Sequence, residues 1–207
     1  MGVHEIMFGT QWYMRLGNWG FNLVLLNLLW LLFSFSGLLV VGIFPATAAL
    51  FAVMRLMIME TDNGSMIKLF WAKFKAEFVA ANVVGYVMML IGLVLYADLK
   101  VLHYVNQDTL YTILMSTTMV VIFIYLLSLL YIFSVFVHYD LKFWQYPKHA
   151  FILVIARPLH TLIMAILVVF ILFLYLQLPV LIVLFGISLI SYVLMKFSYL
   201  SFSKERV

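Results

Sequence analysis

The feature that most constrains the fold of this chain is a series of long stretches without a charged residue. The first covers residues 21–41 and contains no Asp, Glu, Lys or Arg. A helix needs about 20 mainly apolar residues to cross the hydrocarbon core of a bilayer. Apolar residues make up 67% of the 207 residues and charged residues only 10%, which is more apolar surface than a soluble domain of this size can bury. The sequence therefore predicts an all-α, polytopic bundle of transmembrane helices.

Hydropathy and turn signals divide the chain, which we take as a single membrane domain over 1–207, into five predicted spans. They cover about 21–41, 79–96, 110–137, 159–177 and 180–195. Residues 46–59 are too few to cross and include Arg55, so they predict a helix that lies at the membrane interface or dips into it. Residues 65–78 have the pattern of a second interfacial helix, with Leu69, Ala72 and Ala76 on its apolar face. Tryptophans near helix ends are expected to anchor at headgroup depth.

The twelve Lys and Arg residues alternate along the predicted connections. Before, between and after the five spans the counts are 1, 4, 1, 3, 0 and 3. Cytoplasmic loops of membrane proteins are enriched in Lys and Arg. The alternation predicts a multi-pass protein of the cytoplasmic membrane with its N-terminus outside and its C-terminus in the cytoplasm. The lipid bilayer is thus an expected partner, whereas nucleic acid is not, because the cations are scattered between spans.

The residues that would carry catalysis or ion coupling are not found in the predicted spans. The eight acidic residues lie in connections or at helix ends, and cysteine is absent. His138, Asp140 and His149 form the one cluster that resembles metal ligands, but their spacing matches no metal motif. We therefore predict no catalytic, cofactor-binding or metal-binding residues, no cofactor, and no enzyme activity.

Neutral polar residues inside the predicted spans allow two interpretations. Asn27, Asn82 and Thr117 could line a path for a neutral solute, or they could form interhelical or intrahelical hydrogen bonds. A pattern of Phe-Trp, Lys and Phe at residues 70–78 recurs at residues 143–151. The recurrence would fit two copies of a surface helix followed by a hairpin, although chance explains it about as well in a chain with 17% aromatic residues.

One segment is more specific than composition predicts. It reads Gly-Ile-Phe-Pro-Ala-Thr-Ala-Ala-Leu over residues 42–50, with Asn-Leu-Leu-Trp at 27–30 before it and Arg55 after it. Pro45 predicts a helix break with a new helix from Ala46, and the small alanines permit close packing. With Phe-Trp at 70–71 and Lys75, this pattern resembles the YesL-like family of small integral membrane proteins of Gram-positive bacteria.

The resemblance implies a role without assigning an activity. Members of the family often lie near genes for carbohydrate uptake and breakdown, which suggests an accessory or regulatory partner of an ABC-type carbohydrate uptake system. In that hypothesis the helices at 46–59 and 65–78 would dock a sugar permease or its ATPase subunit. The alternative is a stand-alone carrier or channel for a neutral small solute. The predicted interaction residues are Gly42, Phe44, Pro45, Ala46, Thr47, Arg55, Phe70, Trp71 and Lys75.

Overall fold

A computed structural model of the chain describes residues 3–59, 64–102, 104 and 108–202. Residues 60–63, 103 and 105–107, which fall in connections between the predicted helices, lie outside the described residues, as do Lys204 and Arg206. All regular structure in the described part is helical. The helices are α1 (Val3–Ser36), α2 (Ile43–Ile58), α3 (Met66–Ala76), α4 (Phe78–Leu102), α5 (Asp108–His138), α6 (Gln145–Ala156), α7 (Pro158–Gln177), α8 (Val180–Leu184) and α9 (Gly186–Phe202).

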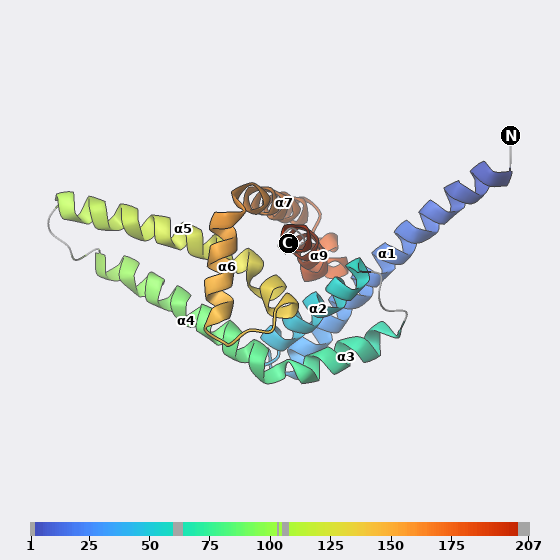
Figure 1. Ribbon diagram of the computed structural model, residues 1–207, viewed down its shortest axis with the longest axis horizontal. Coiled ribbons are helices and arrows are strands. Elements are labelled where there is room, and N and C mark those ends of the chain that lie inside the picture. The colour runs from blue at the N-terminus through green and yellow to red at the C-terminus, as the bar shows by residue number, and fades with distance from the viewer. Residues whose placement is uncertain (1–2, 60–63, 103, 105–107, 203–207) are drawn as a thin grey trace.

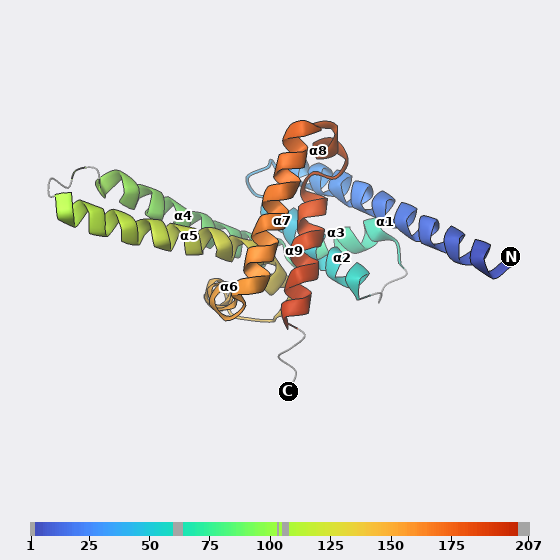
Figure 2. The same ribbon diagram turned by 90° about the horizontal axis from the view of Figure 1, so that it is seen from above.

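The helices radiate from a common centre. The start of α1 projects on one side of the molecule, and the α4–α5 hairpin projects on the opposite side (Figure 1). Helices α7 and α9 run across the direction of that hairpin, as the second view makes clear (Figure 2). Where these arms meet, α2 contacts α1, α3, α4, α5 and α9. Helix α2, which contains most of the 42–50 motif, therefore lies at the centre of the fold.

Four segments are long and apolar enough to cross a membrane. They are Leu16–Ser36, Phe78–Leu102, Thr109–His138 and Pro158–Gln177. These segments correspond to the first four predicted spans, and they indicate a membrane protein. The predicted fifth span, 180–195, is instead divided into α8 and α9, and α9 has 17 residues. Because about 17 residues is the lower limit for a crossing, a fifth crossing stays a prediction.

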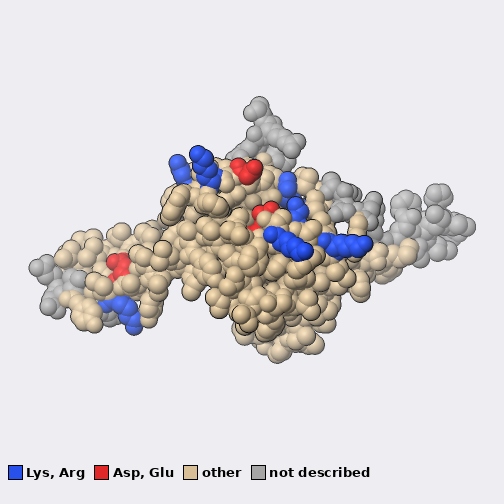
Figure 3. All heavy atoms as spheres, turned by 90° about the horizontal axis from the view of Figure 1, so that it is seen from below, with Lys and Arg blue, Asp and Glu red and all other residues tan. Residues whose placement is uncertain are grey.

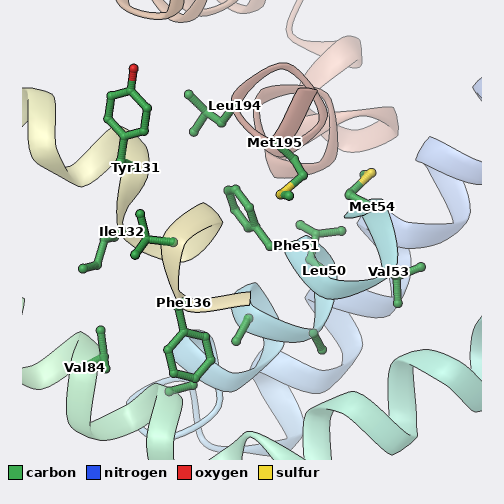
Figure 4. Close-up of a cluster of buried hydrophobic side chains, with 14 of the residues drawn as sticks. Leu50, Phe51, Val53, Met54, Val84, Tyr131, Ile132, Phe136, Leu194 and Met195 are labelled. Atoms are coloured by element: carbon green, nitrogen blue, oxygen red, sulfur yellow. The ribbon is translucent and has the colours of Figure 1, made fainter. Parts of the chain in front are cut away.

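Helix α2 is largely buried inside the protein, which the sequence did not predict. Nine of its sixteen residues, from Pro45 to Met54, are buried within the protein. Phe51 points between α5 and α9, toward Leu194 and Met195, and its ring lies 5.8 Å from that of Phe133 (Figure 4). Most of residues 45–54 therefore belong to the protein core, and the place of the 46–59 segment at the membrane interface stays a prediction. Its alanines place the backbone of α2 close to several neighbouring helices, so the apolar side chains fill the centre of the bundle.

The helix break also lies earlier than predicted. Helix α1 ends at Ser36, and residues 37–42 form turns before α2 begins at Ile43. Pro45 is in the first turn of α2, where a missing N–H leaves no hydrogen bond unmade, so it starts the helix rather than breaking it. The predicted first span, 21–41, was thus too long at its C-terminal end, because the apolar run continues through the turns.

Helix α3 buries a different face from the predicted one. Phe70 and Phe74 are its buried residues, whereas Ala72 and Ala76 of the predicted apolar face are exposed. The aromatic side chains have more apolar area to bury than the alanines. Lys68 and Lys75 remain on the exposed side.

Cationic side chains gather along one side of the molecule (Figure 3). This is also the side on which α9 ends (Figure 2). Apart from Lys100 on the α4–α5 arm, the Lys and Arg residues with described side chains belong to α2, α3, α9 and the segment around α6. Segments that the sequence assigned to the cytoplasm are thus brought together in space.

Candidate functional site

The motif begins at a tight elbow between α1 and α2. Leu38 and Leu39 have φ angles of 55° and 59°, which non-glycine residues rarely adopt. A Cβ on Gly37 would overlap the Cα of Gly42, and a Cβ on Gly42 would lie 2.7 Å from the carbonyl oxygen of Ser34. Gly42 is therefore explained by close approach, because its own φ of −87° is open to any residue.

Phe44 joins the elbow to α4. A Cβ on Gly85 would overlap the ring of Phe44, so that ring lies directly against the backbone of α4. Tyr86 makes an edge contact with Phe44 at a centroid distance of 5.2 Å, and its hydroxyl donates to the carbonyl of Val40 at 2.7 Å. The elbow is thereby held from the α4 side.

Thr47 joins α2 to α1. Its hydroxyl accepts a hydrogen bond from the indole N–H of Trp30 at 3.0 Å and donates to the carbonyl of Ile43 at 2.7 Å. Ala46 beside it is fully buried. Trp30 is therefore a contact residue between α1 and α2.

Asn27 caps the two helix ends at the break between α8 and α9. Its side-chain N–H donates to the carbonyl of Val183 at 2.9 Å, and its oxygen accepts from the backbone N–H of Ile187 at 3.2 Å. A Cβ on Gly186 would lie 2.7 Å from that oxygen, so glycine is needed there. The first N–H groups and last C=O groups of a helix have no partner in their own helix. One amide from α1 therefore caps the end of α8 and the start of α9.

An aromatic cluster binds α3 to the end of α1. The Phe33 ring lies 5.3 Å from Phe70, 5.2 Å from Trp71 and 5.1 Å from Phe74. The Lys75 ammonium lies 4.3 Å from the centre of the Trp71 ring, within cation–π range. Phe70 is fully buried, whereas 43% of Trp71 is exposed.

The second copy of the Phe-Trp pattern is placed differently. Phe143 and Trp144 precede α6 and are 49% and 77% exposed. Both copies precede a hairpin, α4–α5 in the first case and α7 with α9 in the second (Figure 2). The two segments share their place in the chain order but differ in local packing.

A polar cavity lies where α2, α3 and α5 end. Its volume is about 350 Å³, and its charged lining residues are Arg55, Lys73, Glu77 and Asp140. The guanidinium of Arg55 donates to the carbonyl of Val137, close to the C-terminal end of α5, at 3.2 Å. The motif cation thus lines a cavity, a role that the sequence pattern alone could not reveal because the cavity needs residues from both halves of the chain.

Three other hollows are apolar. They have volumes of about 490, 450 and 340 Å³ and lie along α4, between α1 and the α7–α9 hairpin, and between the α4–α5 hairpin and α6. Most of their lining residues are aliphatic or aromatic. Such hollows suit lipid chains or apolar side chains better than a polar solute.

Each of the three polar residues that a solute path would need donates a hydrogen bond within the protein, and the Oδ1 of Asn82 is buried without a partner among the described residues. Asn27 caps α8 and α9 as described. Asn82 donates to the carbonyl of Phe78 at 2.8 Å, and Thr117 donates to that of Ile113 at 2.9 Å, each within its own helix. His149, from the cluster that resembled metal ligands, has Nδ1 2.9 Å from the carbonyl oxygen of Gln145. Among the described residues no three His, Asp or Glu side chains are grouped as metal ligands would be.

Comparisons with known proteins agree with the motif. Residues 23–99 match a family model described as "Protein of unknown function, DUF624". That segment includes all nine predicted interaction residues, from Gly42 to Lys75. No solved structure shows significant similarity.

Three proteins of Bacillus subtilis (strain 168), each described as uncharacterized, are similar over most of their length. YteU is 40% identical over 90% of this chain and 83% of its own. YesL is 32% identical over 97% of this chain and 92% of its own, and YesV is 35% identical over 86% of each. This chain therefore belongs to the YesL-like (DUF624) family.

Proposed function

We propose that this protein is a multi-pass protein of the cytoplasmic membrane that serves as an accessory or regulatory subunit of an ABC-type carbohydrate uptake system. The link to carbohydrate uptake rests on the family resemblance. The observation that carries the accessory role is the burial of α2, which fills the centre of the bundle with apolar side chains. A protein without an open polar centre acts most simply through its outer faces.

The alternative, a stand-alone carrier or channel, requires polar groups that face a solvent-connected path. Asn27, Asn82 and Thr117 each donate to a backbone carbonyl, and the three hollows beside the spans are apolar. Both observations favour a packed bundle over a solute path.

Of the two docking helices that the sequence suggested, at 46–59 and 65–78, we keep the second. Because α2 is mostly buried, we place the docking surface on the outer face of α3. This face exposes Ile67, Lys68, Trp71 and Lys75. Aromatic and aliphatic side chains flanked by cations are common at protein interfaces and at membrane surfaces. Helix α3 also lies inside the segment that the family model matches, whereas α6 does not.

Capture from native membranes tests this proposal. The tagged protein, purified from sugar-grown cells in mild detergent, is expected to bring down a permease or ATPase subunit. A double variant, Lys68→Glu with Lys75→Glu, should reduce the capture several-fold, because it reverses both charges on the docking face. Lys148→Glu reverses an exposed charge on α6 and should leave it unchanged. A clean preparation without any transport component would refute the proposal.

Transport by the isolated protein is the second test. Purified protein reconstituted in liposomes is expected to move no neutral sugar across the membrane. Sugar uptake above that of empty liposomes would favour the carrier instead.

A further inference from the structure

The polar cavity carries an unusual set of charges. Arg55 comes from α2, Lys73 and Glu77 come from α3 and its C-terminal cap, and Asp140 follows α5. Within the described part of the chain, no ion pair of 4.0 Å or less joins any of these four groups. Two cations and two carboxylates therefore face one cavity without neutralising each other in pairs.

Helix ends explain why the cations are present. Helices α2, α3 and α5 end at Ile58, Ala76 and His138, and the C-terminal end of a helix carries a partial negative charge. Arg55 and Lys73 lie in the last turns of α2 and α3. The Nε of Arg55 is nevertheless buried and has no hydrogen-bond partner among the described residues.

One wall of the cavity is aromatic and fixed. Phe136 and Tyr146 line it, with ring centroids 5.1 Å apart. The hydroxyl of Tyr146 accepts from the backbone N–H of Leu141 at 3.2 Å and donates to the carbonyl of Tyr139 at 3.4 Å. The ring is therefore held by the loop that carries Asp140.

We propose that this cavity binds a small neutral molecule with several hydroxyl groups. A hydroxyl group both donates and accepts, so one such ligand can donate to Glu77 and Asp140 and accept from Arg55 and Lys73. A ligand with a net charge would be attracted by one pair and repelled by the other. The aromatic wall offers an apolar surface to the C–H groups of the ligand, and a volume of about 350 Å³ suits a small molecule.

This inference goes beyond the proposed function, because the ligand binds the isolated protein whether or not a permease docks on α3. It is tested by calorimetric titration of the purified full-length chain in detergent or nanodiscs. Glucose and maltose serve as neutral probes, glucose 6-phosphate as an anionic probe and spermidine as a cationic probe. At least one neutral sugar should bind, and both charged probes should bind more weakly than that sugar.

Carboxylate variants identify the site. Glu77→Gln and Asp140→Asn keep the side-chain shape and remove a charged acceptor, so each should weaken sugar binding about tenfold or more. Asp98→Asn makes the same charge change on the α4–α5 arm, where Asp98 accepts from Thr118 at 2.7 Å, and should leave sugar binding unchanged. Unaltered thermal unfolding would show that each variant is folded, and Lys73→Gln provides an independent test from the cationic side.

Three results would overturn the inference. The first is that neither sugar binds the folded wild-type protein at millimolar concentration. The second is that a charged probe binds more tightly than both sugars. The third is that the cavity variants, although folded, bind sugar as well as Asp98→Asn does.

Discussion

Gly85 is the residue that lets α2 and α4 meet through a phenyl ring. A Cβ at this position would overlap the ring of Phe44, so Gly85→Ala should force α4 away from the elbow. Overpacking of this kind costs about 1–3 kcal/mol. We expect Gly85→Ala to lower the thermal unfolding temperature in detergent.

Gly20→Ala is the matched control for this substitution. A Cβ at Gly20 meets no atom within 4 Å, and alanine favours helix formation. The unfolding temperature of Gly20→Ala should therefore equal or exceed that of the wild-type protein. Equal stability of the two variants would contradict the packing of Phe44 on α4.

At the residue scale the sequence identified positions but not partners. Gly42, Thr47 and Arg55 stand out in the motif, but the sequence does not show what they contact. Thr47 accepts a hydrogen bond from Trp30, and Arg55 donates one to the carbonyl of Val137. Asn27 bonds to the backbone of Val183, which lies 156 residues further along the chain. Single-sequence patterns report local periodicity, so contacts of this range become visible only in the fold.

The α8–α9 break is the element that depends most on a distant side chain. Asn27→Leu would leave the carbonyl of Val183 and the N–H of Ile187 without their partner. Each unsatisfied buried group costs about 1–3 kcal/mol, so a clear fall in unfolding temperature is expected.

Asn82→Leu makes the same substitution in α4 and isolates this effect. Asn82 donates only to its own helix, at the carbonyl of Phe78, so its loss should have a small effect, no larger than the average of about 0.6 kcal/mol for bonds between membrane helices. If both variants unfolded at the same temperature, the capping role of Asn27 would be wrong.

Element boundaries were predicted well where polar residues mark them. The fourth span, predicted at 159–177, is helix α7 at Pro158–Gln177, which Arg157 and Pro179 bracket. The elbow at 37–42 escaped prediction because its residues are as apolar as the helix before it. The burial of α2 was not predicted, because its short length and Arg55 suggested an exposed helix. Arg55 instead donates to the carbonyl of Val137 near the end of α5, and most of residues 45–54 are buried.

The whole molecule places most of its described cations on one side, which favours the orientation that the sequence predicts (Figure 3). The absence of cysteine makes single-cysteine labelling clean. With a membrane-impermeant maleimide on intact cells, Leu178→Cys in the α7–α8 link should be labelled. Lys75→Cys and Lys148→Cys should be labelled only after lysis. Labelling of the last two in intact cells would contradict an N-terminus outside and a C-terminus in the cytoplasm.

The central claim is that the motif helix is a buried core element rather than the lining of a path. Ala49 is fully buried in α2, whereas Ala72 is exposed on the lysine-bearing side of α3. The most direct measurement compares the rates at which N-ethylmaleimide modifies Ala49→Cys and Ala72→Cys in native membranes. We predict rapid modification at position 72 and modification at position 49 only after denaturation. Equal rates in the native protein would mean that water reaches α2, and would contradict the account.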